Sequence, residues 1–355
     1  MSSDQLSQGN SRDPALVATA VDFHAHVFPV GLPDLAADTG DERWPALEVG
    51  ARSSGAGRIM CGSRVFRIVR PPLWDLSARL AELDRAGIAT QVVSPVPVTM
   101  TYWAPAELAA RFQRQQNDAI ARDVDAAGGR LLGLCGVPLQ DPAAAVTELE
   151  RAVRQLGLRG VQIGSRIGDM DLDDPRLSPF FAAAESLGAV VFVHPTDGGE
   201  GTIRRAGPPF DWGLGMPTDT AIAATSLVFE GVLARHPGLQ VVLAHGCGTF
   251  PLAFPRLAMG ALMTGQIDAA GFAALPDAVR RLWVDALVFD PASLALLIER
   301  FGEEHVLLGT DDPFVPDQLS EAQQVVQKAL AKGLISQHQA TGVLGANARA
   351  LLDIE

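Results

Sequence analysis

The chain has 355 residues and a mass of 37.4 kDa, with 28 basic and 41 acidic side chains, a formal charge of −13 and a pI near 5.0. This acidic balance, without any basic run, argues against nucleic-acid partners and against docking on anionic membranes. A hydrophobic content of 48% is enough for a large core, which excludes intrinsic disorder. Of the basic residues, 26 are arginine and only two are lysine, Lys328 and Lys332.

Residues 1–14 are polar and lack the apolar stretch of a signal peptide, so we expect a flexible tail followed by a single domain over residues 15–355. Nowhere does an apolar run approach the roughly 20 residues that cross a bilayer. The three cysteines, Cys61, Cys135 and Cys247, are odd in number and far apart, which is typical of a reducing compartment. We therefore expect a soluble, cytoplasmic protein.

Short apolar runs alternate with longer helical patterns along the chain. The runs are mostly continuously apolar, as in parallel strands that are buried on both faces. They predict strands over residues 18–26, 90–96, 131–137, 160–164, 189–194, 239–245, 282–287 and 306–309. The helical patterns predict helices over residues 73–86, 105–126, 142–156, 177–187, 218–235, 291–301 and 320–332.

Eight strands that alternate with helices predict a (β/α)8 TIM barrel, with a doubly wound open sheet as the alternative. Residues 30–72 interrupt this alternation, because they are rich in glycine and carry separate apolar runs at 59–61 and 65–69. We interpret this segment as a small insertion after strand 1, with short strands of its own.

Histidines stand at the C-terminal ends of three predicted strands. His24 and His26 close the first in V-D-F-H-A-H, His194 closes the fifth in V-V-F-V-H-P, and His245 closes the sixth in V-V-L-A-H-G. Asp311 closes the eighth, in L-L-G-T-D-D-P-F. A barrel carries its active site at this face, and residues two apart on a strand project to the same side. Because imidazole and carboxylate are standard Zn²⁺ ligands, the set predicts a metal site.

Each histidine taken alone has a plainer interpretation, since a histidine at a strand end is most often a hydrogen-bonded structural residue. We adopt this interpretation for His236 at a helix end, His305 before strand 8 and His338 in a surface helix. A metal-free barrel that acts only as a binding protein stays open as a third class of function. It would require the whole ligand set to be present by chance.

Longer motifs accompany these residues: V-D-F-H-A-H-V-F-P (21–29), V-P-V-T-M-T-Y-W-A (96–104), G-M-P-T-D-T (215–220), A-H-G-C-G-T-F-P (244–251) and L-G-T-D-D-P-F (308–314). From about residue 18 to the end, the chain resembles the amidohydrolase superfamily. More finely, it is similar to the amidohydrolase-2 branch that contains the 2-amino-3-carboxymuconate 6-semialdehyde decarboxylases. The several motifs together indicate the branch, whereas H-x-H alone would indicate only the superfamily.

The resemblance implies one Zn²⁺ held by His24, His26, His194 and Asp311, with water in the open position and Mn²⁺, Fe²⁺ or Co²⁺ as alternative ions. It also implies that His245 is the base that deprotonates this water, and that Asp311 serves catalysis through the metal. A metal lowers the pKa of water from about 15.7 to about 7, where an imidazole can take the proton.

The lysine count limits the number of metals. In the superfamily, members with two metals typically bridge them through a carbamylated lysine on strand 4. Here the predicted strand 4 reads G-V-Q-I-G-S (160–165), and no lysine precedes Lys328. We therefore expect a single-metal site. Both lysines lie in a late, polar helix, which also argues against a Schiff-base mechanism.

The resemblance also implies substrate contacts. Arg67 and Arg256 match positions that hold substrate carboxylates, the second from a neighbouring subunit, and the planar arginine fork suits a carboxylate. We therefore expect a homodimer and a small-molecule carboxylate as substrate. Trp103 and Thr196 are further candidate substrate contacts. A surface ion pair is the alternative for each arginine, since 26 are present.

Three residues depart from the decarboxylase pattern. Thr196 replaces a tryptophan after H-P, Asp312 replaces a tyrosine after the strand-8 aspartate, and Cys247 replaces a glycine in H-G-G-G. We expect the metal chemistry to survive these changes. Asp312 should point away from the metal if the strand continues, and so could support the ligands from outside. The identity of the substrate stays open.

The leading hypothesis is a metal-dependent, non-oxidative decarboxylase of an aromatic or muconate-semialdehyde-type carboxylate. The alternative keeps the site and changes the reaction. It is a hydrolase, a hydratase, or an enzyme that condenses or cyclises aminohydroxybenzoate-type substrates in a biosynthetic pathway.

Overall fold

The structure is a computed structural model that describes residues 20–50, 55–196, 201–205 and 207–354. The predicted tail over residues 1–14 lies outside the described residues. Within them, the main sheet has eight strands in the order β1-β5-β6-β7-β10-β11-β12-β13, each parallel to its neighbour. The strands are β1 (Ala20–Val27), β5 (Ile88–Pro95), β6 (Leu131–Cys135), β7 (Gly160–Gly164), β10 (Val190–His194), β11 (Val241–Leu243), β12 (Leu282–Asp285) and β13 (Val306–Leu307).

Backbone hydrogen bonds join β1 to the segment that follows β13 and so close the sheet. The N–H of Phe23 donates to the Leu308 carbonyl at 2.8 Å, and the N–H of Asp311 donates to the His24 carbonyl at 2.8 Å. A parallel bridge pairs Ala25 with the residue after Asp311. This closure confirms the predicted (β/α)8 barrel and rules out the open sheet.

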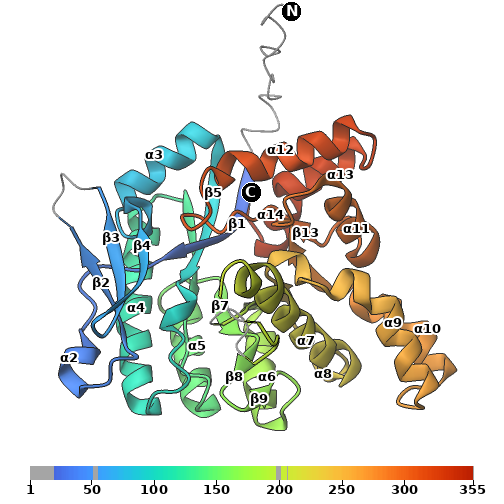
Figure 1. Ribbon diagram of the computed structural model, residues 1–355, viewed down its shortest axis with the longest axis horizontal. Coiled ribbons are helices and arrows are strands. Elements are labelled where there is room, and N and C mark those ends of the chain that lie inside the picture. Colours follow the sequence, from blue (N-terminus) through green and yellow to red (C-terminus); the bar gives the residue numbers. More distant parts are fainter. Residues whose placement is uncertain (1–19, 51–54, 197–200, 206, 355) are drawn as a thin grey trace, which may run out of the picture.

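Helices follow the strands and surround them (Figure 1). They are α3 (Leu76–Ala86), α4 (Ala106–Ala126), α5 (Pro142–Arg154), α6 (Ser178–Leu187), α7 (Met216–Phe229), α8 (Val232–Arg235), α9 (Phe250–Met263), α10 (Ala269–Val279), α11 (Pro291–Phe301), α12 (Gln318–Ala331), α13 (Gln337–Thr341) and α14 (Asn347–Leu352). Figure 1 shows α9 and α10 extending away from the barrel.

One helix prediction is wrong, and two helices were not predicted. The single helix predicted over residues 218–235 is wrong, because the chain breaks between α7 and α8 at Gly231, whose φ of 75° lies in the left-handed region. The sequence also did not predict α9 or α10. Each carries an internal proline, Pro255 and Pro276, which removes a helical donor and reads as a helix breaker.

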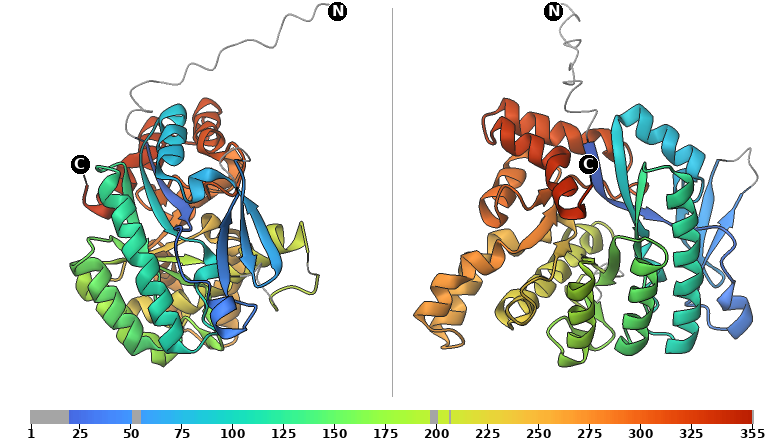
Figure 2. Two further views of the ribbon diagram at one scale, coloured as in Figure 1. Left: turned by 90° about the vertical axis from the view of Figure 1, so that its left-hand side faces the viewer. Right: turned by 180° about the vertical axis from the view of Figure 1, so that it is seen from behind.

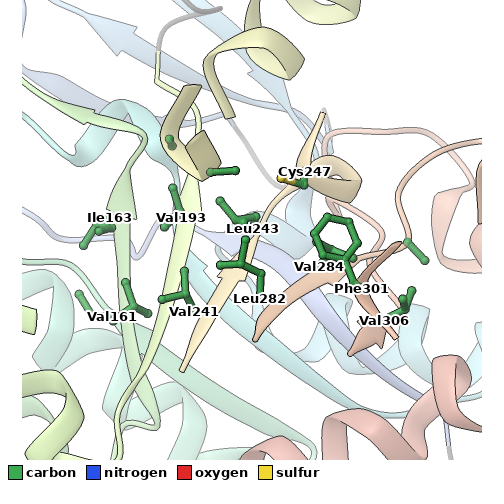
Figure 3. Packing of buried hydrophobic residues seen from close by; sticks show 14 of the residues in the cluster. Val161, Ile163, Val193, Val241, Leu243, Cys247, Leu282, Val284, Phe301 and Val306 are labelled. Carbon is green, nitrogen blue, oxygen red and sulfur yellow. The ribbon is translucent and has the colours of Figure 1, made fainter. Parts of the chain in front are cut away.

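Apolar side chains form two buried layers. The outer layer joins strand residues such as Val161 and Val241 to helix residues such as Phe301 (Figure 3). The inner layer joins strands from around the ring through side chains that include Phe23 and Phe192, and α14 packs against it. This rigid interior supports the C-terminal ends of the strands, where the candidate site residues lie.

Between β1 and α3 the chain builds a small unit beside the barrel (Figure 2). It contains the short helix α2 (Leu35–Thr39) and an antiparallel sheet, β2-β3-β4. Its strands are β2 (Pro45–Val49), β3 (Gly57–Cys61) and β4 (Arg64–Val69), so the predicted strands at 59–61 and 65–69 are present. A two-stranded sheet, β8 (Arg166–Ile167) and β9 (Met170–Asp171), follows β7.

Candidate metal centre

The predicted ligands meet at the C-terminal face of the barrel. His24 and His26 lie on β1, His194 is the last residue of β10, and Asp311 follows β13. All four are buried, with at most 8% of their surface exposed. Each contributes one ligand atom, and these atoms lie within 4.8 Å of one another. We call these four residues the His/Asp cluster.

A β-bulge in β1 turns consecutive side chains toward the barrel interior. The pairing of β1 with β5 shifts register between Asp22 and Ala25. The Phe23 ring lies edge-on to Phe192 at 5.6 Å, and the next ring, that of His24, meets the same phenyl at 4.9 Å. A regular strand would send these neighbours to opposite faces. The bulge therefore brings His24 inward, above the apolar interior.

Distances within the cluster fit four protein donors around one metal ion. The Nε2 atoms of His24 and His26 are 3.2 Å apart, and Nε2 of His26 is 3.2 Å from Oδ1 of Asp311. Zn²⁺ with bonds of about 2.1 Å would hold adjacent ligand atoms about 3.0–3.4 Å apart. The Nε2 atom of His194 is buried and has no hydrogen-bond partner among the described residues. An unpaired buried nitrogen beside three other donors is what a metal would satisfy.

Outer hydrogen bonds leave the inward nitrogen of each histidine ligand free for a metal. In all three imidazoles Nδ1 faces an oxygen acceptor, which favours protonation there and a lone pair on Nε2. The acceptors are a carboxylate oxygen of Asp285 at 2.7 Å from His24, the Pro95 carbonyl at 3.3 Å from His26 and the Pro195 carbonyl at 2.8 Å from His194.

Electrostatics in the cluster also suit ligation. Burial lowers the pKa of His26, and lowers that of His194 well below its ordinary value, so both are neutral at pH 7. Burial alone would raise the pKa of Asp311, but its hydrogen bond with His26 and the other nearby histidines lower it to about 2. His26 and His194 therefore present neutral imidazoles and Asp311 an ionised carboxylate, which are the forms that bind metal. At His24, burial lowers the pKa, but the hydrogen bond with Asp285 and the nearby carboxylate charges together outweigh it and raise the pKa above the ordinary value.

His245 lies beside the cluster, two residues beyond β11. Its ring centre is 5.2 Å from that of His24 and 5.0 Å from that of His194. Its Nδ1 has no hydrogen-bond partner within the described chain, and burial lowers its pKa to about 4. His245 is therefore a neutral imidazole, beside the His/Asp cluster, whose Nδ1 has no partner among the described residues.

The two candidate substrate arginines lie in different settings. Arg67 is on the exposed strand β4, with its guanidinium 4.6 Å from the Phe314 ring centre, and that ring is 5.6 Å from His26. Arg256 is exposed on α9 and makes no hydrogen bond or ion pair with the cluster within the described residues. The fold thus brings Arg67 to the rim of the site through Phe314, whereas a single chain does not bring Arg256 there.

Trp103 and Thr196 are also separated. Trp103 packs against Trp44 at 5.1 Å, beside α2, with no described contact to the cluster. Its neighbour Tyr102 lies closer to the strand ends, because its hydroxyl accepts a 3.1 Å hydrogen bond from the N–H of Gly164. A Cβ atom on that glycine would meet both the Tyr102 ring and the Thr196 methyl at about 3 Å, so these two side chains share the rim near His194.

Asp312 belongs to a second buried polar group, the Arg79 network, which consists of Arg79, Asp312, Gln91, Asp22 and Thr310. The guanidinium donates to Asp312 at 3.3 Å and to Gln91. Gln91 in turn donates to Asp22 at 2.8 Å, and the Thr310 hydroxyl donates to the same carboxylate at 2.6 Å. Asp312 therefore turns toward the arginine and away from the cluster.

Sequence reasoning missed Asp285, which ends β12 and is fully buried. The available signal was a lone aspartate at the end of an apolar strand, L-W-V-D, at the face where the other site residues gather.

Cys247 is buried, and burial raises the pKa of its thiol well above the ordinary value, so it is no nucleophile here. No helix in the described part of the chain has the length and apolar character needed to cross a membrane.

Comparison with known proteins places this geometry in context. The sequence profile of the amidohydrolase family matches residues 21–354. The 2-amino-3-carboxymuconate-6-semialdehyde decarboxylase of Dictyostelium discoideum is 37% identical over 308 residues, covering 85% of each chain.

Two solved structures share the fold. The 5-carboxyvanillate decarboxylase of Sphingomonas paucimobilis has a TM-score of 0.76 and 26% identity, covering 95% of this chain and all of that one. A dihydroxybenzoic acid decarboxylase from Polaromonas sp. JS666, with bound manganese and the inhibitor 2-nitroresorcinol, has a TM-score of 0.70 and 21% identity, covering 94% of this chain and 97% of that one.

Proposed function

The chain belongs to the amidohydrolase family, and from this premise we propose that it is a metal-dependent, non-oxidative decarboxylase of an aromatic or muconate-semialdehyde-type carboxylate. It is an enzyme of the carbon–carbon lyase class. The observation that carries the proposal is the buried His/Asp cluster at the mouth of the barrel, beside the imidazole of His245, whose Nδ1 has no partner among the described residues. The wider set of relatives named as decarboxylases supports the reaction class.

We propose one Zn²⁺ per chain, held by Nε2 of His24, His26 and His194 and by an oxygen of Asp311. The manganese in the Polaromonas enzyme supports a divalent ion without favouring zinc. When bound, the cation supplies positive charge for the oxygen atoms of the substrate and lowers the pKa of water in the site. The absence of any lysine on β7 supports a single metal.

In the proposed reaction, His245 accepts and donates the proton, and Arg67 orients the substrate. A proton adds to the carbon that bears the carboxylate, the carbon–carbon bond breaks, and its electron pair stays on that carbon as CO₂ leaves. His245 is neutral at pH 7, so its imidazole offers a lone pair to this proton. Arg67, fixed against Phe314, presents its fork to a carboxylate at the rim.

We propose that the enzyme is a cytoplasmic homodimer in which Arg256 reaches the site of the partner subunit. On α9, Arg256 shares one helical face with Leu252, Met259 and Met263, at spacings of four, three and four residues. These three apolar side chains are 80%, 46% and 80% exposed, so the face has the composition of an interface. Subunits that carry only His245→Ala should regain activity when they are mixed with subunits that carry only Arg256→Ala. The hybrid dimer then contains one site with both His245 and Arg256 intact.

The direct test measures CO₂ release and metal content on the same preparation. Hydroxybenzoates, aminohydroxybenzoates and carboxymuconates form the substrate panel, with Zn²⁺, Mn²⁺, Fe²⁺ and Co²⁺ compared after chelation. We expect CO₂ release that requires one metal per chain and no O₂. A metal-replete protein that releases no CO₂ from any of these substrates would contradict the proposal.

Hydrolysis, hydration, or condensation of aminohydroxybenzoates remains the second candidate, and one observation favours it. Thr196, which lies at the rim beside Tyr102, is smaller than the tryptophan of the decarboxylase pattern. The side of the site near His194 therefore has a different shape. Asp312 no longer supports this alternative, because it pairs with Arg79. Ring or amide products formed from the same panel without CO₂ would favour the second candidate.

A further inference from the structure

Asp285 occupies a central position between the His/Asp cluster and His245. Its Oδ2 atom accepts from Nδ1 of His24 at 2.7 Å and from the backbone N–H of His245 at 2.9 Å. Its Oδ1 atom accepts from the N–H groups of Gly246 and Leu287, both at 3.0 Å. A carboxylate has about four acceptor positions, and all of them are used here.

The bond to His24 determines which nitrogen of that imidazole faces the metal position. When Nδ1 carries the proton that Asp285 accepts, Nε2 must present its lone pair. This Nε2 atom lies 3.2 Å from the Nε2 of His26, inside the cluster. The Asp285 contact is charge-assisted, and His24 is fully buried, so the ring has little freedom to turn.

The bonds to His245 and Gly246 hold a backbone turn that a peptide does not adopt readily. His245, Gly246 and Cys247 have φ values of 57°, 61° and 62°, all in the left-handed region. Non-glycine residues seldom adopt this conformation, and it persists where the surroundings impose it. Successive N–H groups in such a turn converge on an anion, which here is the Asp285 carboxylate. The position of the His245 ring therefore depends on Asp285.

Gly309 leaves Asp285 no room to move away. A Cβ atom at this glycine would lie 2.7 Å from Cβ of Asp285 and 3.1 Å from Cβ of His24. Both contacts are closer than side chains normally tolerate, and both involve atoms next to the backbone. Only glycine therefore allows the segment after β13 to lie against this pair.

We infer that Asp285 is a positioning residue that couples the metal ligand His24 to the base His245, by setting the tautomer of the first and the backbone of the second. The inference rests on the proposed function for the roles of these two histidines. It adds a single carboxylate on which both metal binding and proton handling depend. Its carboxylate acts through the two histidines, so we do not assign it contact with the substrate.

The first test is Asp285→Asn, with Asp290→Asn as the matched control. An amide NH₂ in either orientation would face two N–H donors, so Asn cannot replace the carboxylate. Asp290 lies five residues further on, in an exposed N-cap that accepts from Ser293. We expect Asp285→Asn to weaken metal binding by about 10- to 100-fold in a chelator competition titration, and Asp290→Asn to leave it unchanged. A folded Asp285→Asn protein that binds the metal within twofold of wild type would overturn the inference.

Two further measurements decide the matter if Asp285→Asn fails to fold. Nitrogen-15 histidine NMR of the metal-free wild type should show His24, identified by its loss in His24→Gln, protonated at Nδ1. The bulkier Gly309→Ala, which keeps the carboxylate but displaces it, should weaken metal binding in the same direction. A His24 ring protonated at Nε2 with Nδ1 bare, or unchanged affinity in Gly309→Ala, contradicts the inference. None of these readouts needs CO₂ release, so an inactive but metal-binding wild type would refute the proposed function alone.

Discussion

Two buried polar groups lie side by side in this barrel, and they differ in whether their atoms are paired. In the Arg79 network, Arg79, Asp312 and Asp22 each have side-chain partners within the described structure. In the His/Asp cluster, Nε2 of His194 has no hydrogen-bond partner among the described residues, and the same holds for Nδ1 of the adjacent His245. Asp311 and Asp312 are neighbours in sequence, yet Asp311 belongs to the His/Asp cluster and Asp312 to the Arg79 network.

The difference indicates that the Arg79 network stabilises the fold, whereas the His/Asp cluster has donor atoms available for a ligand. Leaving a buried polar atom unpaired costs free energy, so most such atoms in a folded protein have partners. The Arg79 network links β1, α3 and the segment after β13, where the barrel closes. The His/Asp cluster directs its unpaired nitrogen toward three other donor atoms. Substitutions in the two groups should therefore have separable effects on stability and on metal binding.

The largest effect should come from His194→Ala. Removing one of four ligands should abolish stoichiometric metal binding and lower CO₂ release by more than about 10³-fold, because the metal is expected to contribute several kcal/mol to catalysis. Metal content by mass spectrometry and turnover on the same sample check this. If the variant retains one metal per chain, the ligand assignment is wrong.

His245→Ala should lower turnover by about 10²- to 10⁴-fold while metal content stays that of the wild type. The reason is that His245 is proposed to move a proton and not to bind the metal. This substitution separates chemistry from ligation inside the same site. Loss of metal from the folded variant would make His245 a ligand instead.

Arg79→Met should affect stability first. It leaves the buried Asp312 with only the partly exposed Arg70, at 3.4 Å, as a cationic partner. Breaking a buried pair typically costs up to about 3–5 kcal/mol. Urea denaturation should record this loss, whereas the metal affinity of the folded variant should stay within a few-fold of wild type. Unchanged stability together with lost metal binding would reverse the distinction between the two groups.

The smallest effect concerns Asp219 at the rim, which accepts from the Ser165 hydroxyl and the Thr196 N–H. Burial raises its pKa above the ordinary 3.8, although these two donors oppose the shift. Between the unfolded and folded pKa values the native state holds more protons than the unfolded state, so the free energy of unfolding falls as pH rises. Asp219→Asn should therefore gain stability relative to wild type as pH rises from about 4. If the free energy of unfolding changes with pH to the same extent in both proteins, the prediction is wrong.

Much of the fold and the ligand set could be predicted from the sequence, because both depend on local patterns. Continuously apolar runs separated by helical periods indicated the strands and the barrel. H-x-H at 24–26, with His194 and Asp311 at other strand ends, indicated a shared site, since parallel strands in a barrel end at one face. The missing lysine before residue 328 predicted a single-metal site without any structural information.

Only the tertiary structure decided how these residues are supported. His24 and Asp285 are 261 residues apart, and they meet only because β1, β12 and the strand between them close one ring. The bulge that turns His24 inward after Phe23 exists only in the pairing of β1 with β5. Likewise, strand alternation predicts that Asp311 and Asp312 point apart, but it does not identify the partners of either side chain. Long-range packing and hydrogen bonding choose their partners, and these interactions do not exist until the barrel is closed.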